Sequence, residues 1–274
     1  MKFGLDVVSF GDYADPRNVV ELAQAAEASG WDGLFVWDHL AFTWGVPSGN
    51  PFVILSAVAQ ATERLKFGPT VTPIARHQPL ILANILATLD LLSAGRLIFG
   101  AGLGGVAEEF QAYGGPVEAK TRAIMLDEGL EILSRLFNGE ALTYQGQYYV
   151  VRDSTLSPLP LQRPRPPFWI GGDSHPALRR AAQWDGWVTT CMDEVHNITQ
   201  SPELFAERLA YLRQRRSSAE PFEIALSGTA IPGKEALVKE FAAAGATWWL
   251  ETVAPLFGSH EEMLARVKAG PPRG

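Results

Sequence analysis

The chain has 274 residues, of which 47% are hydrophobic and 19% are charged, a composition typical of a globular protein with a full core. Its formal net charge of −7 argues against nucleic acid as a partner, because binding to a phosphate backbone requires clustered positive charge. The sequence has no apolar run of 18 residues, so we expect no membrane span, and its first residues lack a signal-peptide pattern. We therefore expect a cytoplasmic protein.

The single cysteine, Cys191, excludes an internal disulfide and a cysteine-based zinc site. No basic cluster near it in the sequence would activate its thiol, so we expect a small buried residue rather than a nucleophile. We predict no metal site in this chain.

The first part of the chain alternates short apolar runs with segments of helical periodicity. Gly30 follows the first helical segment and suits a helix C-terminus. Strands are expected at 3–8, 33–37, 65–68 (extending to about 71) and 96–100, and helices at 18–29, 52–63 and 79–93. This alternation is typical of βα units around a parallel sheet.

A long segment then interrupts the alternation. A strongly amphipathic helix is expected at 120–138, and residues 139–166 follow with alternating Thr, Tyr and Val and then several prolines. We interpret 139–166 as an excursion that contains a small hairpin, rather than as a second domain. A connection of this length is more often functional or lid-forming than neutral.

The alternation resumes after the excursion. Strands are expected at 167–171, 186–190, 222–227 and 246–253, and helices at 175–184, 202–216, 234–244 and 259–268. Eight strand–helix pairs with short connections predict an α/β protein with a closed (β/α)₈ TIM barrel. We expect one domain over residues 1–274, with the insertion between the fourth and fifth strands.

Active sites of such barrels lie at the C-terminal ends of the strands. Polar residues and glycines, together with Val71, gather at these predicted ends: Ser9, Asp38, His39, Thr70, Thr72, Gly102, Gly104, Gly105, Gly171, Gly172, Asp173, Ser174, Thr189, Thr190, Ser227, Gly228, Thr229 and Glu251. Trp37, Trp44, Trp187, Trp248 and other aromatic residues near these ends suit an apolar pocket, although some of them must belong to the core.

The run GAGLGG at 100–105 formally contains GxGxxG after a strand. A dinucleotide site also needs an acidic residue at the end of a second strand about 20 residues later, and the helix at 120–138 occupies that position. The glycines either let backbone approach a flat ligand closely or form a simple tight turn.

Two further motifs favour ligand chemistry. Gly171, Gly172, Asp173 and Ser174 precede a helix, where free backbone N–H groups can bind a phosphate; Asp173 or Ser174 can also cap that helix, and the two roles are compatible. The Asp38-His39 pair can hold a general base or a hydrogen-bond donor, or it is a structural pair that fixes the loop. Arg76-His77 can bind an anionic group or pair with a helix.

Three stretches together resemble the bacterial luciferase-like family of flavin- or deazaflavin-dependent oxidoreductases. They are LAQAAEASGWDGLFVWDHL, HQPLILANILATLDLLSAGRLIFGAGLGGVAEEFQAYG and RPPFWIGGDSHPALRRAAQWDGW. The resemblance covers nearly the whole chain and keeps the order and spacing of the family's motifs. It departs from many relatives at Gly105-Val106, where they have Trp-Asn, and the chain is short for the family.

The resemblance implies a cofactor ring between the third and fourth strands. A backbone bulge, often with a cis non-prolyl peptide, would fall at Pro69, Thr70 and Val71, with Thr72 also at the cofactor. Asp38 would contact the ring or its polar edge, and Gly102 and Gly104 would line it. Gly171, Gly172, Asp173 and Ser174 would hold the phosphate. His39 and Trp44 match residues beside the reactive carbon in the deazaflavin branch, so the resemblance favours F420 over FMN.

The function expected on this basis is a luciferase-like oxidoreductase that uses F420 or reduced FMN on a small organic substrate. With FMN, a separate reductase would supply reduced flavin for a monooxygenase; with F420, a hydride would pass to or from C5 without oxygen. The alternatives are a cofactor-free barrel enzyme that acts on a phosphorylated metabolite, with Asp38 and His39 as its acid/base residues, and a non-catalytic flavin-binding relative. Relatives imply a homodimer through the second and third helices, and specificity is expected in loops 40–50, 139–166 and 191–201.

Overall fold

A ring of parallel strands forms the centre of the computed structural model, which describes residues 1–193, 197–230 and 235–272. The strands are β1 Lys2–Val7, β2 Gly33–Val36, β3 Lys66–Pro69, β4 Thr72–Pro73, β5 Phe99–Gly102, β8 Phe168–Gly171, β9 Gly186–Thr190, β10 Glu223–Gly228 and β11 Trp248–Val253. Their order in the sheet is β3-β2-β1-β11-β10-β9-β8-β5-β4. The ring closes between the two ends of this order, because Phe67 of β3 bridges Leu97, just before β5.

β3 and β4 are two parts of one barrel strand. β3 pairs with β2, whereas β4 pairs with β5, and the chain between them shifts sideways at Thr70 and Val71. The Thr70–Val71 peptide bond is cis, at the position where the family resemblance places a backbone bulge. With β3 and β4 counted together, the described residues form eight barrel strands, so the predicted (β/α)₈ architecture is confirmed.

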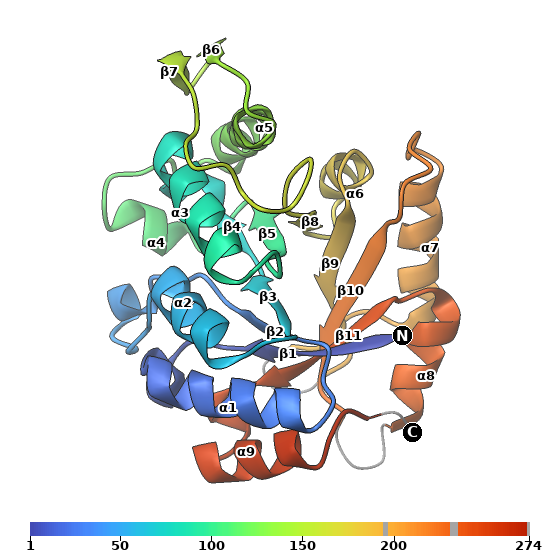
Figure 1. Cartoon of the computed structure of the whole chain (residues 1–274). Coiled ribbons are helices and arrows are strands. Elements are labelled where there is room, and N and C mark those ends of the chain that lie inside the picture. The colour runs from blue at the N-terminus through green and yellow to red at the C-terminus, as the bar shows by residue number, and fades with distance from the viewer. Residues whose placement is uncertain (194–196, 231–234, 273–274) are drawn as a thin grey trace.

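Helices surround these strands (Figure 1). They are α1 Pro16–Ala28, α2 Pro51–Ala61, α3 Pro79–Leu92, α4 Ala107–Gln111, α5 Ala119–Phe137, α6 His175–Ala181, α7 Pro202–Arg213, α8 Glu235–Ala244 and α9 His260–Lys268. Short 3₁₀ segments are η1 Gly11–Ala14, η2 Ala41–Trp44, η3 Ile74–Arg76 and η4 Pro255–Phe257. No described helix has both the length and the apolar character required to cross a bilayer.

The sequence explains where several of these helices begin. Asp15, Asn50, Ser174 and Ser201 are N-caps whose side chains accept hydrogen bonds from backbone N–H groups of the first turn. A proline lies within the first two helical positions after each of them, where the missing N–H costs nothing. These local signals place the helix starts independently of the barrel.

The fourth predicted strand, 96–100, begins later than expected, because β5 covers Phe99–Gly102. Arg96 does not extend the strand; its buried guanidinium donates hydrogen bonds to the carbonyls of Ala59 (2.7 Å) and Leu65 (3.0 Å). These hydrogen bonds satisfy the buried charge of the Arg96 guanidinium. Arg96 therefore belongs to the loop before β5 and not to the strand.

The excursion contains the predicted hairpin. β6 Leu142–Gln145 and β7 Val150–Ser154 pair in antiparallel fashion. Glu128 of α5 accepts the backbone N–H groups of Gln147 (2.6 Å), Tyr148 (3.1 Å) and Tyr149 (3.0 Å), which ties the hairpin to that helix. The hairpin therefore lies beside α5 at the outside of the molecule (Figure 1).

Large apolar side chains fill the barrel interior. Phe35 stacks on Trp169 at 5.2 Å between ring centroids, and Trp248 meets both rings edge to face. Trp187 and Trp249 are fully buried outside this interior cluster, and Cys191 is buried as expected. Trp187, Trp248 and Trp249 are therefore core residues, and the predicted pocket does not include them.

Candidate active site

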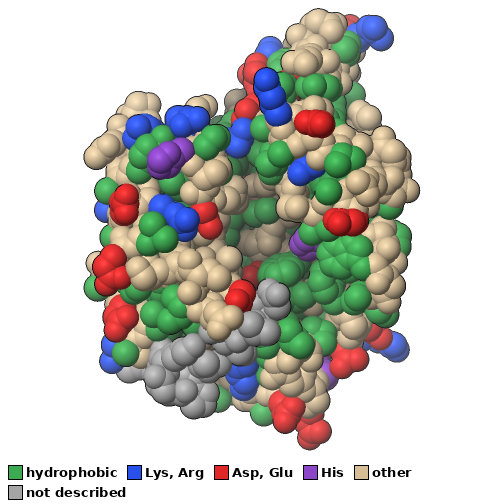
Figure 2. All heavy atoms as spheres, turned by 180° about the vertical axis from the view of Figure 1, so that it is seen from behind, with side chains coloured by type: hydrophobic (Ala, Val, Ile, Leu, Met, Phe, Trp, Pro, Cys, Tyr) green, Lys and Arg blue, Asp and Glu red, His purple; other side chains and the backbone are tan. Residues whose placement is uncertain are grey.

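A cavity of about 400 Å³ lies at the C-terminal ends of the barrel strands, and we call it the central cavity. Nine of the twelve predicted catalytic and cofactor-binding residues line it: Asp38, His39, Thr70, Val71, Gly102, Gly104, Gly171, Gly172 and Asp173. The face shown in Figure 2 is hollowed near its centre, and hydrophobic side chains border the hollow. The fold thus brings together residues that are as much as 135 positions apart in the sequence.

The Val71 side chain explains why glycine is required at one position on each of the neighbouring strands β5 and β8. A Cβ on Gly102 would lie 2.3 Å from Val71 Cγ2, and a Cβ on Gly171 would lie 3.1 Å from Val71 Cγ1. The bulge therefore directs the Val71 side chain against the barrel interior, where it packs on the cluster around Phe35 and Trp169. Gly102 and Gly171 make room for this side chain, and the backbone of the bulge borders the cavity.

The loop after β5 has two glycines of different character. Gly104 has a φ of +79°, and a Cβ there would lie 2.8 Å from the Phe110 ring, so both the backbone and the space require glycine. A Cβ on Gly105 would meet no atom within 4 Å, so this residue borders open space beside the cavity. The GxGxxG pattern is therefore a strand end followed by an open loop.

Asp6, at the C-terminal end of β1, lines the central cavity and was not predicted from the sequence. It accepts hydrogen bonds from Thr70 Oγ1 (2.8 Å) and Trp37 Nε1 (3.1 Å). Burial raises the pKa of the Asp6 carboxyl to about 6, and these neutral donors offset burial only in part. One Asp within an otherwise apolar, buried strand was the signal that could have identified it.

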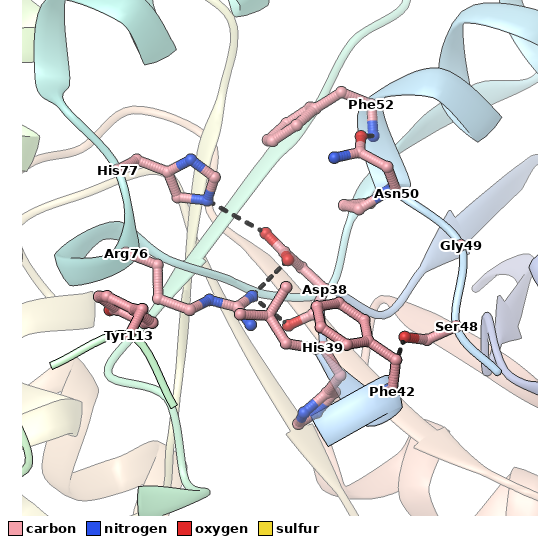
Figure 3. A pocket seen from close by; sticks show the side chains of 12 residues that line it. Asp38, His39, Phe42, Ser48, Gly49, Asn50, Phe52, Arg76, His77 and Tyr113 are labelled. Atoms are coloured by element: carbon pink, nitrogen blue, oxygen red, sulfur yellow. Dashed lines mark hydrogen bonds and ion pairs between the residues drawn. The ribbon is translucent and has the colours of Figure 1, made fainter. Parts of the chain in front are cut away.

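A buried charge network lies beside the cavity and centres on Arg76 (Figure 3). Arg76 pairs with the Asp38 carboxylate, donates to the Asp38 carbonyl (2.6 Å), and donates to Glu109 Oε2 (3.0 Å). His77 Nε2 lies 3.5 Å from Asp38 Oδ2. Burial by itself would raise the pKa of Asp38, but His77 and Arg76 together hold it below its usual value.

His39 belongs to the same network through Glu109. Its Nδ1 lies 2.8 Å from Glu109 Oε1, which also accepts the backbone N–H of Leu40 at 2.8 Å. Trp44 lies beside the His39 ring, with 5.9 Å between centroids, although Trp44 itself is not part of the described cavity lining. Glu109 lies 70 residues from His39 on the short helix α4, and no spacing in the sequence connects the two.

His39 and Asp38 also line a neighbouring cavity of about 410 Å³, together with Arg76, His77 and Tyr113 (Figure 3). The Arg76 network thus separates two hollows, and His39 is accessible from both. Arg76-His77 pairs with the end of β2 and with α4, which is the structural alternative left open for these residues.

The predicted phosphate segment combines a cap with an ion pair. Ser174 Oγ accepts the N–H of Ala177 at 3.4 Å and caps α6, and Ser174 is not among the described residues that line the cavity. Gly172 has a φ of +113°, which favours glycine. Asp173 hydrogen-bonds to Thr189 and lies 3.7 Å from Arg208 Nη1, so its negative charge has a partner.

Two other expectations differ from the structure. Thr72 is fully buried in β4, opposite Ala101 of β5, and lies below the described cavity lining. Residues 139–166 contribute nothing to the described lining of the cavities at the strand ends, because the hairpin is held on α5. The described residues of this excursion are therefore not part of these cavity walls, and their role in specificity stays a prediction.

Comparisons with known proteins agree with the fold. Residues 2–267 match the luciferase-like monooxygenase family. An F420-dependent glucose-6-phosphate dehydrogenase of Microbacterium testaceum is 32% identical over 214 residues, which are 76% of this chain and 60% of that protein. An uncharacterised protein of Mycobacterium tuberculosis is 28% identical over 241 residues, which are 80% of each chain. This chain spans less than two thirds of the length of the dehydrogenase.

Solved structures show the same fold at low sequence identity. Monooxygenase RslO1 from Streptomyces bottropensis aligns with a TM-score of 0.80 and 22% identity, over 98% of this chain and 97% of that one. The F420-dependent tetrahydromethanopterin reductase from Methanopyrus kandleri aligns with a TM-score of 0.77 and 17% identity, over 97% of each chain. The family predicted from the sequence is thus confirmed, and the chain belongs to the luciferase-like monooxygenase family.

Proposed function

We propose that the protein is an F420-dependent oxidoreductase that acts on a small organic substrate. The observation that carries this proposal is His39, which lines the central cavity and is oriented through Nδ1 by the buried Glu109. Relatives named F420-dependent glucose-6-phosphate dehydrogenase support F420 as the cofactor rather than FMN. We do not propose glucose 6-phosphate as the substrate of this chain.

The residues around the central cavity fit a flat ring with a phosphate. The backbone of Thr70 and Val71 borders one side, and Gly102 and Gly104 border another, while the space beside Gly105 is open. We assign the ring to these residues and to Asp38. The phosphate is assigned to Gly171, Gly172 and Asp173 and to the N-terminus of α6, which Ser174 caps. We assign no cofactor contact to Thr72, because its side chain is buried.

The chain's own groups then position the substrate and move one proton. When bound, F420 supplies the ring carbon that accepts or releases a hydride. If Nδ1 of His39 donates to Glu109, Nε2 is left as an acceptor that removes a proton from a substrate hydroxyl and returns it in the reverse direction. Trp44 packs beside this ring.

Equilibrium titration with F420 and, separately, with FMN tests the cofactor assignment. We expect F420 to bind at least about tenfold more tightly than FMN. The His39→Asn variant should bind F420 as the wild type does and should turn it over about 10²–10⁴-fold more slowly, which is the usual contribution of a general acid or base. Tighter binding of FMN, or binding of neither cofactor, would overturn the proposal.

We also propose a partner enzyme, a homodimer and a cytoplasmic location. A separate reductase or dehydrogenase that regenerates the spent form of F420 is required if turnover runs in one direction in a cytoplasmic setting. A homodimer through α2 and α3 is supported by apolar side chains that these adjacent helices expose, among them Val53 at 60% and Ile81 at 62%.

A further inference from the structure

A third cavity, of about 630 Å³, adjoins the central cavity, and we call it the apolar chamber. Trp37, Thr190 and Ser227 line both, so the two are continuous at these residues. The other described residues that line the chamber are Val8, Phe10, Gly11, Val46, Met192, Asp193, Thr199, Thr229, Thr252, Ala254, Pro255, Leu256 and Phe257. They come from the ends of β1, β9, β10 and β11 and from η1 and η4.

The chamber wall is hydrophobic and carries no described positive charge. The charged side chain in its described lining is Asp193, whose two carboxylate oxygens accept hydrogen bonds from Asn197 N (2.8 Å) and Asn197 Nδ2 (2.9 Å). An anionic substrate would therefore lose its hydration, meet a carboxylate and find no cation among these residues, which is unfavourable. The described part of the wall therefore disfavours an anionic substrate.

The wall also leaves apolar surface uncovered. Leu256, on η4, is 67% exposed although it lines the chamber, and Val46 on the opposite loop is 37% exposed. An apolar occupant would remove this surface from water, at a gain of about 25 cal/mol per Å² buried. The volume lies within the range of pockets that hold drug-sized ligands.

Two polar residues of the chamber, Thr190 and Ser227, lie at its junction with the central cavity, whereas Asp193, Thr199, Thr229 and Thr252 lie elsewhere in its described lining. Thr190 and Ser227 present hydroxyl groups there, and the Thr190 hydroxyl donates to the carbonyl of Met192 at 3.0 Å. A hydroxyl oxygen that donates in this way still has lone pairs with which it accepts a hydrogen bond. A substrate oxygen at this junction would be adjacent to the cofactor position.

We propose that the apolar chamber is the substrate site, and that it takes an uncharged, largely hydrocarbon molecule with a single hydroxyl or carbonyl oxygen. The hydrocarbon part lies in the apolar chamber. The oxygen lies at the junction that Trp37, Thr190 and Ser227 line, beside the Trp37 ring, whose centroid is 5.7 Å from that of His39. The chemical step at that oxygen rests on the proposed F420-dependent function, whereas occupation of the chamber does not.

Binding of two probe molecules to the full chain tests this assignment. The neutral probe is 1-tetralol, a bicyclic secondary alcohol, and the charged probe is glucose 6-phosphate; calorimetry measures each with and without F420. We expect 1-tetralol to bind in both conditions and glucose 6-phosphate to bind in neither. Binding of glucose 6-phosphate as tight as that of 1-tetralol would overturn the proposal.

Substitutions that fill the chamber locate the probe. Ala254→Phe places a ring inside the wall and should weaken 1-tetralol binding at least about tenfold, while F420 binding is unchanged. Val46→Trp fills the chamber from its exposed rim and serves if Ala254→Phe does not fold. Ala265→Phe, on the exposed face of α9, is the matched control. Unchanged 1-tetralol affinity in a folded chamber variant would exclude this site.

The outcomes separate the two proposals. If 1-tetralol binds in the chamber but F420 does not bind, the proposed cofactor fails and the chamber assignment stands. If F420 binds and 1-tetralol does not, the cofactor assignment stands and the apolar substrate class is wrong.

Discussion

The neighbours of two buried aspartates at the strand ends shift the pKa values of these aspartates in opposite directions. Asp6 meets Thr70 and Trp37, which are neutral donors, so burial dominates and its pKa rises to about 6. Asp38 is also buried, but His77 and the Arg76 guanidinium hold its pKa below the usual value. Asp6 is therefore the carboxyl that can exchange a proton near neutral pH, whereas Asp38 stays ionised.

Replacement of Asp6 by Asn should change the pH dependence of stability. The folded-state pKa of about 6 lies above the ordinary 3.8, so the folded state binds the proton more tightly and wild-type stability falls as pH rises between these values. Relative to Asp6→Asn, the wild type should lose at most about 3 kcal/mol of unfolding free energy between pH 4 and pH 7. Urea denaturation at a series of pH values measures this difference, and parallel stability curves would contradict it.

Glu109 should be as important for stability as for activity. Its carboxylate faces Arg76 and His39 and is 1% exposed. Glu109→Gln should lower the free energy of unfolding by about 3 kcal/mol, because it leaves the buried Arg76 with less compensating charge. Under the proposed function it should also lower the kcat of F420 turnover, since the His39 ring loses its carboxylate partner.

The neighbouring exposed Glu108 on α4 provides the control for this variant. Glu108→Gln should change stability by no more than about 0.5 kcal/mol, as is usual for surface substitutions. Equal losses in the two variants, measured by urea denaturation, would show that the buried network has no special role.

At the scale of elements, the bulge between β3 and β4 and the glycines of β5 form one packed unit. Val71 fills the space that side chains on Gly102 and Gly171 would need, and a Cβ on Gly100 would lie 2.1 Å from the Pro69 carbonyl oxygen. The backbone of β5 therefore lies close to the backbone of β3 at this point of the barrel. The same glycines that resemble a nucleotide motif are required by strand packing before any ligand binds.

Gly102→Ala should therefore destabilise the barrel by about 1–3 kcal/mol, since its Cβ would overlap Val71. Gly105→Ala, which adds a Cβ into open space, is the matched control and should be nearly neutral. In a Val71→Ala background the cost of Gly102→Ala should shrink, and a double-mutant cycle on thermal unfolding measures this coupling. Additive effects would show that the two side chains do not compete for space.

At the scale of the whole molecule, the two ends of the barrel differ. Arg96 joins the last turn of α2 and the loop before β3 to the loop before β5, at the N-terminal ends of the strands, while the central cavity opens at the C-terminal ends. The outer surface carries a different feature, because α2 and α3 expose apolar residues side by side.

The proposed dimer predicts a change of mass when this surface is charged. The double variant Val53→Asp/Ile81→Asp should be monomeric, because burial of two carboxylates in an apolar interface is costly, and its circular dichroism should match the wild type. Val150→Asp, on the exposed hairpin strand β7, should leave the mass unchanged. Light scattering after gel filtration measures these masses; a monomeric wild type would contradict the dimer.

The amino-acid sequence was sufficient for the alternation of strands and helices, the closed barrel and the family. These depend on local periodicity, on caps such as Asp15 and Ser174, and on contiguous motifs. It also predicted most of the central cavity, because the C-terminal ends of parallel strands meet at one end of a barrel.

Only the tertiary structure decided which side chains meet within that end. Asp6 reaches Thr70 across 64 residues, and Glu109 reaches His39 across 70. No local periodicity in the sequence predicts these two contacts. They form because the barrel closes and because the chain shifts sideways at the bulge. The same closure buried Thr72 and enclosed the apolar chamber, whose walls come from strands at both ends of the sequence.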